Sequence, residues 1–205
     1  MAFLEHTVGI ALRPDIEWKA IRSEKHSFKQ VFLNHVPFLA LIPCVSFFIG
    51  ITQVGWVFGS GDAVKLTVQS AAQLCIVTYF ALLAAVFVFS EFINWMSRTF
   101  GVRESAERRR YNGTALAVYV TTPIFLMGVF GLYPNLWLNV SVLGIAGAYA
   151  IYLIYDGLPI LMNISRDQGF MFASSIVIVG FVMMMMMLVS SVILWNIGLG
   201  PVYID

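Results

Sequence analysis

Long apolar stretches alternate with short polar segments along most of this chain. Five stretches each exceed the roughly 18 to 20 residues needed to cross a hydrocarbon core about 30 Å thick. Lipid offers no partners to free backbone N–H and C=O groups, so these stretches are predicted to be helices. The pattern therefore predicts an all-α, polytopic membrane helix bundle with five transmembrane helices. The spans cover approximately residues 36–58, 70–95, 114–133, 136–156 and 171–198.

The segment before the first apolar stretch has a different pattern, because charged and apolar residues are mixed over residues 13–32. At helical spacing, Ile16 and Ala20 share one face and Trp18 and Ile21 share another. This pattern predicts a short amphipathic helix on the cytoplasmic membrane surface, with Trp18 at the depth of the lipid headgroups. A helix packed against the cytoplasmic loops, with no role in lipid binding, is the alternative.

Composition and chain length favour a single membrane domain. Apolar residues make up 60% of the 205 residues and charged residues 11%, whereas soluble proteins average about half and about a quarter. The connections between the apolar stretches are short. We therefore expect one integral membrane domain over residues 1–205, in which residues 1–32 form the cytoplasmic amphipathic segment.

The distribution of basic residues predicts the orientation. If the five spans alternate in direction, eleven of the twelve basic residues lie on one side of the membrane, and Lys65 lies on the other. Basic residues are retained in the cytoplasm, so the amino terminus is expected inside and the carboxyl terminus in the periplasm. An even number of spans would place basic residues on both sides of the membrane, so the charge pattern supports five spans. The eleven residues are Arg13, Lys19, Arg22, Lys25, Lys29, Arg98, Arg103, Arg108, Arg109, Arg110 and Arg166.

Part of this basic side is a candidate surface for lipid or a protein partner, formed by Trp18, Arg108, Arg109 and Arg110. Basic residues close to a membrane attract anionic headgroups, so we expect the lipid bilayer, with anionic lipid at its cytoplasmic face, as the partner. Residues 103–113 are basic enough to attract nucleic acid. Because these residues lie between two spans, their positive charge is better explained by membrane topology and lipid phosphate than by nucleic acid. No nucleic-acid partner is expected.

Two carboxylates lie at the ends of predicted spans. Glu91 is expected about one turn inside the cytoplasmic interface, where an ionisable group suggests a function. The alternative is that Glu91 extends toward Arg98. Asp156 follows Leu136 by 20 residues, or about 30 Å of helix. We therefore expect Asp156 at the cytoplasmic interface, paired with a loop arginine such as Arg98 or Arg166, and a working acid inside the membrane is the alternative.

The third span carries a group of polar residues, Tyr119, Thr121 and Thr122, directly before Pro123. With the two carboxylates, these three are the candidate polar lining of a cavity, because transporter sites often form at interrupted helices. Pro43 in the first span and Pro123 in the third each remove a helical hydrogen bond and predict a kink. Hydrogen bonding between packed helices is the alternative role for the neutral polar residues.

Cysteine and methionine contribute packing in this interpretation. Cys44 and Cys75 fall inside the first and second spans, at depths that differ by roughly 10 Å or more, so two free thiols are predicted. The five methionines at 183–187 point to all sides of a helix and are interpreted as apolar filler, since a copper site needs converging thioethers.

No pattern in the sequence assembles an enzyme. His6, His26 and His35 lack metal-ligand spacing, and there is no nucleophile motif or phosphate-binding glycine loop. We expect a protein that is not an enzyme and that has no metal and no cofactor.

The pattern P-x-x-x-W-x-x-I, formed by Pro14, Trp18 and Ile21, resembles the entry to bacterial members of the Ypt-interacting protein (Yip) domain family. The resemblance continues through 42–67, 119–138 and 155–175, and it is specific to the inner-membrane branch of that family. It implies an integral protein of the bacterial inner membrane. Bacterial members are described loosely as transport proteins, and eukaryotic relatives are associated with Rab GTPases and vesicle traffic.

The family also bears on Asp156. The position before Gly-Leu-Pro is usually apolar in relatives, commonly Leu, so this chain departs from the family there. A carboxylate that relatives lack is a poor candidate for a shared mechanism.

Two classes of function remain open. The first is a small transporter or permease of unknown substrate, with Glu91 and the region around Pro123 lining a cavity that a homo-oligomer would enlarge. The second is a scaffold that organises the membrane or binds partners through the amphipathic helix and the arginine cluster 108–110. Polar residues near the midplane are few, which counts against transport of a polar solute, and the family resemblance counts for transport.

Overall fold

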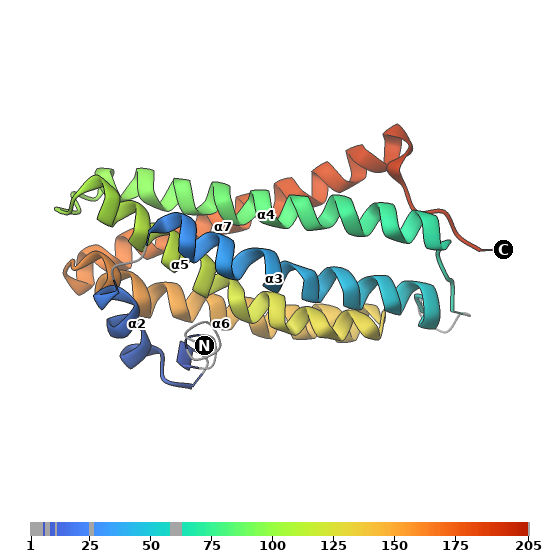
Figure 1. Ribbon diagram of the computed structural model, residues 1–205, viewed down its shortest axis with the longest axis horizontal. Coiled ribbons are helices and arrows are strands. Elements are labelled where there is room, and N and C mark those ends of the chain that lie inside the picture. Colours follow the sequence, from blue (N-terminus) through green and yellow to red (C-terminus); the bar gives the residue numbers. More distant parts are fainter. Residues whose placement is uncertain (1–5, 7–8, 11, 25–26, 58–62, 205) are drawn as a thin grey trace.

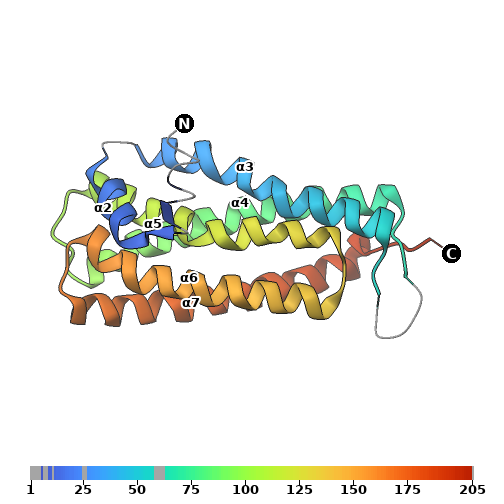
Figure 2. The same cartoon turned by 90° about the horizontal axis from the view of Figure 1, so that it is seen from below.

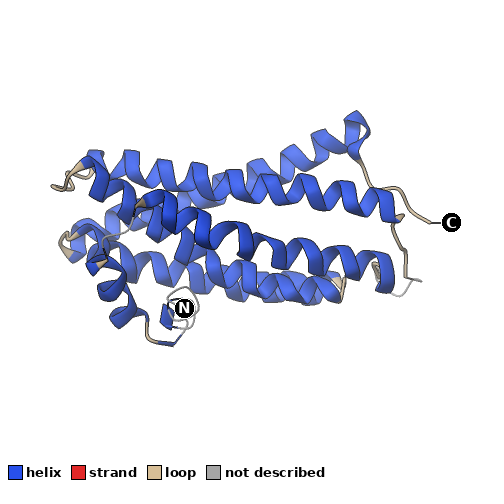
Figure 3. Ribbon diagram, viewed as in Figure 1, coloured by secondary structure: helices blue, strands red, loops and turns tan. Residues whose placement is uncertain are grey.

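Long helices that run up and down along one axis account for most of the structure (Figures 1 and 3). The computed structural model describes residues 6, 9–10, 12–24, 27–57 and 63–204, so Lys25 and His26 lie outside the described residues. The helices are α2 Pro14–Ser23, α3 Phe28–Ile49, α4 Val68–Thr99, α5 Ala106–Met127, α6 Leu136–Met162 and α7 Arg166–Leu194. Short extensions with π or 3-10 geometry follow three of them: η1 Gly50–Val54, η2 Gly128–Leu132 and η3 Trp195–Leu199.

Five of the helices in the described chain are long and apolar enough to cross a membrane, which confirms the predicted all-α bundle. With their extensions, they cover residues 28–54, 68–99, 106–132, 136–162 and 166–198. The α2 helix precedes them, as the amphipathic pattern predicted.

One end of the bundle gathers the basic residues. It carries α2, the start of α3, the α4–α5 connection and the α6–α7 connection (Figure 1). Among the described residues, every Lys and Arg except Lys65 belongs to these segments or to the helix ends beside them, and we call this the basic end. Lys65 lies at the opposite end, where its carbonyl accepts a hydrogen bond from the Ile204 backbone N–H at 2.9 Å. Charge therefore divides between the two ends as the sequence pattern predicted.

At the basic end, all five helices run four to eight residues beyond the predicted spans. The first of these helices begins at Phe28, before residue 36, and the fourth ends at Met162, after residue 156. Hydropathy marks only the apolar part of a helix, whereas these helices continue into more polar sequence. At 1.5 Å per residue, the extensions form a helical layer about 6 to 12 Å thick outside the apolar stretches.

Side-chain caps fix where the spanning helices begin. Ser27 and Gln30 form a capping box at the start of α3, with the Ser27 backbone N–H donating to Gln30 Oε1 at 2.9 Å. Each later span begins at a Ser, Thr or Asn whose side-chain oxygen accepts a backbone N–H from the first turn, which satisfies one of the free donors there. These cap residues are Thr67, Ser105, Asn135 and Ser165.

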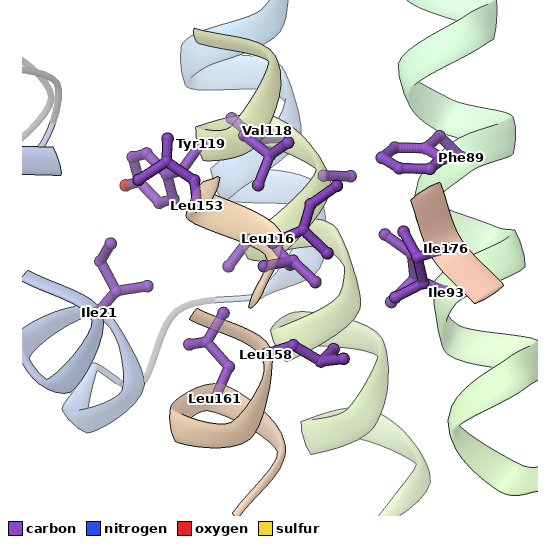
Figure 4. Close-up of a cluster of buried hydrophobic side chains, with 14 of the residues drawn as sticks. Ile21, Phe89, Ile93, Leu116, Val118, Tyr119, Leu153, Leu158, Leu161 and Ile176 are labelled. Carbon is purple, nitrogen blue, oxygen red and sulfur yellow. The ribbon is translucent and has the colours of Figure 1, made fainter. Parts of the chain in front are cut away.

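The α5 helix lies at the centre of the bundle. In the most apolar part of α5, half of the residues are buried, and the same holds for α3. The buried share is only 11% for α4 and 6% for α7. Leu116 and Val118 of α5 pack among residues from the neighbouring helices (Figure 4). The outer surfaces of α4 and α7 are therefore left for lipid or for another protein.

The two cysteines are free thiols, as predicted, but their predicted separation in depth is wrong. The Cys75 thiol donates to the Cys44 backbone carbonyl at 3.3 Å. Because α3 begins eight residues earlier than predicted, Cys44 lies further along the bundle and reaches the level of Cys75 on the antiparallel α4.

Candidate functional site

The amino-terminal helix α2 packs against α6 at the basic end of the bundle (Figure 2). Trp18 and Ile21 are fully buried, and the Trp18 ring lies edge-on to Tyr119 of α5 with 6.3 Å between ring centroids. The position predicted for Trp18, at the headgroup surface, is therefore wrong. The alternative interpretation, a helix packed against the rest of the protein, describes this face of α2.

A glycine on α6 makes room for Trp18. A Cβ atom placed on Gly157 would lie 2.4 Å from Trp18 Cε2, well inside van der Waals contact. The Trp18 indole therefore packs directly on the backbone of a spanning helix. The Arg22 guanidinium adds a hydrogen bond to the Ile160 carbonyl at 2.9 Å, which fixes the far end of α2 on α6.

The other face of α2 points away from the bundle. Leu12 is 74% exposed and Ile16 is 62% exposed, and Ala20 is exposed one turn further on. The sequence therefore predicted the two faces of this helix correctly, with Ile16 and Ala20 on one side and Trp18 and Ile21 on the other. Leu12 and Ile16 form an apolar stripe that remains available to lipid or to a partner.

Beneath α2 lies a group of polar residues that we call the amino-terminal polar cluster. His6 Nδ1 is hydrogen-bonded to Glu17 Oε1, and His6 Nε2 lies 2.6 Å from Glu24 Oε1. All three side chains are largely buried, with exposed fractions of 12%, 17% and 21%. The cluster continues through Tyr111, Tyr119 and His35.

The two carboxylates favour the charged form of His6. Both ring nitrogens of His6 face an acceptor oxygen, and both can donate only when the imidazole is protonated. Burial lowers the pKa of His6, but the hydrogen bonds and charges of Glu17 and Glu24 together outweigh burial and raise the pKa above its ordinary value of 6.5.

His35 and Tyr119 extend the cluster into the spanning part of the bundle. His35 Nδ1 donates to the Val31 carbonyl at 2.8 Å, so the neutral ring presents Nε2 as an acceptor. The Tyr119 hydroxyl donates to this Nε2 at 3.2 Å. Tyr119 thereby contacts Trp18, His6 and His35 at once and joins α2, α3 and α5.

Tyr111 and Arg108 connect the cluster to the α4–α5 connection. The Tyr111 hydroxyl donates to the Ile21 carbonyl at 2.8 Å, and Arg108 Nη1 donates to the Glu24 carbonyl at 2.7 Å. The Arg108 guanidinium also lies over the Tyr111 ring, 4.9 Å from its centroid. These contacts hold the end of α2 from the α5 side.

Glu91 is ion-paired with Arg110, and its expected neighbour Arg98 is not its partner. Arg110 Nε and Nη2 donate to Glu91 Oε1 at 2.9 and 2.7 Å across the α4–α5 pair. The Arg110 guanidinium lies 3.8 Å from the centroid of the Phe28 ring at the start of α3. A carboxylate near the membrane is thus neutralised by charge and hydrogen bonds from the next helix.

The arginine cluster 108–110 was predicted to face lipid or a partner. Arg108 and Arg110 instead bind residues of the chain, and Arg109 Nη1 donates to the Glu104 carbonyl at 2.6 Å. All three are only partly exposed. The arginines therefore tie α5 to the elements around it, because a guanidinium finds carboxylate and carbonyl acceptors at the crowded helix ends.

The remaining candidate lining residues on α5 do not converge on a cavity. Thr121 Oγ1 donates to the Ala117 carbonyl and Thr122 Oγ1 to the Val118 carbonyl, both at 2.9 Å and both within α5. The helix continues through Pro123 to Met127, and α3 likewise continues through Pro43. Pro43 packs against η2, where a Cβ atom on Gly128 would lie 2.5 Å from Pro43 Cβ.

Asp156 lies apart from these residues, in a groove between α2, α6 and α7. The helix continues for six residues beyond it, so Asp156 is about 9 Å from the end of α6. Arg166 lines the same groove, as one of the two predicted neighbours, and Arg98 does not. The structure thus separates the candidate lining residues. Glu91 pairs with Arg110, Tyr119 is bonded to His35, and Asp156 lies in the groove. Thr121 and Thr122 are bonded within α5.

Sequence reasoning missed most of the amino-terminal polar cluster, namely His6, Glu17, Glu24, His35 and Tyr111. The capping box at Ser27 and Gln30 was the available signal for His35, because it starts the helix early enough to place His35 two turns inside. The described residues include no group of three or more His, Cys, Asp or Glu side chains arranged to hold a metal.

Comparison with known proteins gives a consistent picture over nearly the whole chain. The Yip1 domain matches residues 8–187. The inner membrane protein YohC of Escherichia coli strain K12, and that of E. coli O6:H1, are each 36% identical over 195 residues, which is 95% of this chain and 98% of the relative. No solved structure matches the chain.

Proposed function

This chain belongs to the Yip1 domain family and is an integral inner-membrane protein, and from that premise we propose that it is a membrane-organising scaffold. It acts through its basic end, which we place in the cytoplasm by the positive-inside rule. The observation that supports this proposal most is the packing of α2 on the bundle. Trp18 is buried against Gly157 of α6, so α2 covers the end of the bundle where the basic residues gather.

The hydrogen-bond partners of the candidate lining residues also favour a scaffold over a permease. The Thr121 and Thr122 hydroxyls bond to carbonyls of their own helix, and Glu91 is neutralised by Arg110. A path for a polar solute needs polar groups that face a shared space, and these groups face backbone or each other. On this proposal, the exposed stripe formed by Ile16 of α2 and by Leu12 just before it is the surface that meets the cytoplasmic leaflet or a partner.

Transport is the second candidate, and one observation supports it. His6, Tyr119 and His35 form a row of polar side chains that enters the spanning region: the Tyr119 ring contacts His6, and its hydroxyl is hydrogen-bonded to His35. Rows of this kind carry protons in pumps and transporters. A proton path is therefore the form of transport that this arrangement favours.

Proton flux separates the two candidates. The full chain is reconstituted in liposomes that contain a pH-sensitive dye, and a potassium diffusion potential drives protons. We expect wild type to conduct no faster than empty liposomes, and Glu91→Gln and His35→Gln to leave that result unchanged. Flux through wild type that His35→Gln abolishes would replace the scaffold by a proton-coupled transporter.

A photo-crosslinking amino acid tests the scaffold directly. Placed at Ile16 in cells, it is expected to capture lipid or another protein. The matched control is the same amino acid at Phe172, a fully buried aromatic position, where we expect crosslinks within the chain only. Equal capture at both positions would contradict the proposed role of the α2 surface.

A further inference from the structure

A groove at the basic end carries four charged side chains of both signs. Its volume is about 570 Å³, and it lies between α2, α6 and α7. Asp15 and Lys19 line it from α2, Asp156 from α6 and Arg166 from α7. None of the four makes an ion pair within 4.0 Å with another residue of the described chain, although Lys19 and Arg166 are near enough to Asp156 to attract it. Two acidic and two basic groups that share one groove without direct contact favour a ligand that carries both a positive and a negative group.

The acidic part of the groove needs a cationic hydrogen-bond donor. Asp156 Oδ2 is buried and has no hydrogen-bond partner among the described residues. The carboxyl group of Asp15 lies close enough to that of Asp156 to hydrogen-bond to it when one of the two is protonated. A buried carboxylate oxygen without a donor is costly, and two neighbouring carboxylates repel each other. A primary ammonium supplies three N–H donors and one positive charge, so it satisfies both carboxylates at once.

The basic part of the groove fits an anion. Lys19 and Arg166 approach it from two different elements, α2 and the first turn of α7. Ammonium and guanidinium groups bind phosphate oxygens through charge-assisted hydrogen bonds. An ammonium and a phosphate within one small ligand therefore match both parts of the groove.

The walls of the groove indicate that this ligand is a lipid. Tyr152, Tyr155 and Phe170 lie beside the charged residues. Tyr152 is 49% exposed and Phe170 is 63% exposed, and both belong to spanning helices, so the groove opens toward the membrane. Aromatic side chains at such an interface pack against the glycerol and upper acyl region of a phospholipid.

We propose that this groove binds a phospholipid with a primary ammonium headgroup, of the phosphatidylethanolamine class. The ammonium lies between Asp15 and Asp156, the phosphate lies against Lys19 and Arg166, and the acyl chains run past Tyr152 and Phe170. The site goes beyond the proposed function and holds for a scaffold or a transporter. It does rest on α2 being seated on α6, since α2 supplies two of the four charges.

Native mass spectrometry of the full chain in detergent tests the site. The purified protein is stripped of lipid and titrated with phosphatidylethanolamine, phosphatidylcholine and phosphatidylglycerol that carry the same acyl chains. We expect the first to bind about tenfold more tightly than the other two. Phosphatidylcholine has a phosphate but no N–H donor, and phosphatidylglycerol has no cation.

Two variants separate the parts of the headgroup. Asp156→Asn is expected to weaken phosphatidylethanolamine binding about tenfold and to leave phosphatidylcholine binding unchanged. Lys19→Gln is expected to weaken the binding of both lipids. The matched control is Asp167→Asn, which removes the same charge from the first turn of α7, outside the groove, and leaves the lipid preference as in wild type.

Three results would contradict the proposed lipid site. The site is overturned if wild type shows no preference among the three lipids, or if Asp156→Asn and Asp167→Asn change it equally. Soluble phosphorylethanolamine that binds as tightly as the lipid would overturn the lipid assignment. The proposed function has a separate test: proton flux through wild type would contradict the scaffold and would leave the lipid preference unchanged. Protection of α2 from trypsin in Asp156→Asn checks that the variant keeps α2 seated.

Discussion

Two ionisable residues at the basic end, Glu91 and His6, are held by specific charged partners. Glu91 pairs with Arg110 on the neighbouring helix, and His6 lies between Glu17 of α2 and Glu24, the residue that directly follows α2. A charge with restricted access to water is costly unless it is paired, and this cost is larger for the more buried His6 than for Glu91. Each pair therefore also fixes the position of the elements that carry it.

His6 is expected to make the seating of α2 depend on pH. Its pKa is raised in the folded chain, so its contribution is fully present below about pH 6.5, the ordinary value, and is lost as pH rises through the folded pKa. We expect trypsin to release the amino-terminal segment faster at pH 9 than at pH 6, after correction for the pH dependence of trypsin on an unfolded peptide. In His6→Gln the two corrected rates should be equal. A pH dependence that survives in His6→Gln would show that another group is responsible.

The Glu91 and Arg110 pair is expected to contribute modestly to stability. Both side chains are more than a third exposed, so solvent screens the pair and a coupling free energy of about 0.5 to 1 kcal/mol is expected. A double-mutant cycle with Glu91→Gln and Arg110→Gln, followed by thermal unfolding in detergent, measures it. The coupling should fall as salt is added. A coupling near zero at low salt would mean that the pair is an incidental surface contact.

The sequence identified Glu91 as unusual and could not identify its partner. Arg98 is close along the chain, whereas Arg110 reaches Glu91 only because the α4–α5 connection sets one helix beside the other. The same limit applies to His35 and Tyr119, which are 84 residues apart. Partners across helices depend on how the helices are rotated and shifted, and hydrophobic patterns leave both open.

At the scale of elements, α2 shows what periodicity can and cannot predict. The pattern correctly predicted a helix and its two faces, one with Ile16 and the other with Trp18. It assigned the Trp18 face to lipid, because a tryptophan on an amphipathic helix suits a headgroup layer equally well. The deciding feature is Gly157, which lies 139 positions further along the chain and offers a flat surface to the indole.

Two glycines of α6 provide a matched test of this packing. In Gly157→Ala the new methyl group would overlap the Trp18 ring, so we expect α2 to shift and the stability to fall by about 1 to 3 kcal/mol. A Cβ atom on Gly144 meets nothing within 4 Å, so Gly144→Ala should change stability by less than about 1 kcal/mol. Apparent melting temperatures in detergent provide the comparison. Equal effects of the two substitutions would contradict the packing of Trp18 on α6.

At the scale of the whole molecule, hydropathy and charge predicted the architecture well. Apolar length alone gave five spans, and the basic residues gather at one end of the structure, as alternation requires. The polar helix extensions at the basic end were not predictable from hydropathy, because they lie outside hydrocarbon. They carry His35 and Tyr111 of the amino-terminal polar cluster, and Arg166 and Phe170 of the groove.

The orientation of the bundle has a direct test. Reporter enzymes or fluorescent proteins fused at Asp205 and inserted near Arg108 are expected to report from opposite sides of the inner membrane, with Arg108 in the cytoplasm. The physical reason is the excess of basic residues at one end. Reports from the same side would refute the arrangement of five alternating spans.

The seating of the amino-terminal helix on the basic end of the bundle is the claim on which the scaffold, the pH dependence and the lipid groove all rely. Trypsin cleavage at Lys19 and Arg22 in inside-out membrane vesicles measures this seating most directly. Wild type and Gly144→Ala should stay intact at both bonds, and Gly157→Ala should be cut. If wild type is cut as fast as Gly157→Ala, α2 does not form part of the bundle.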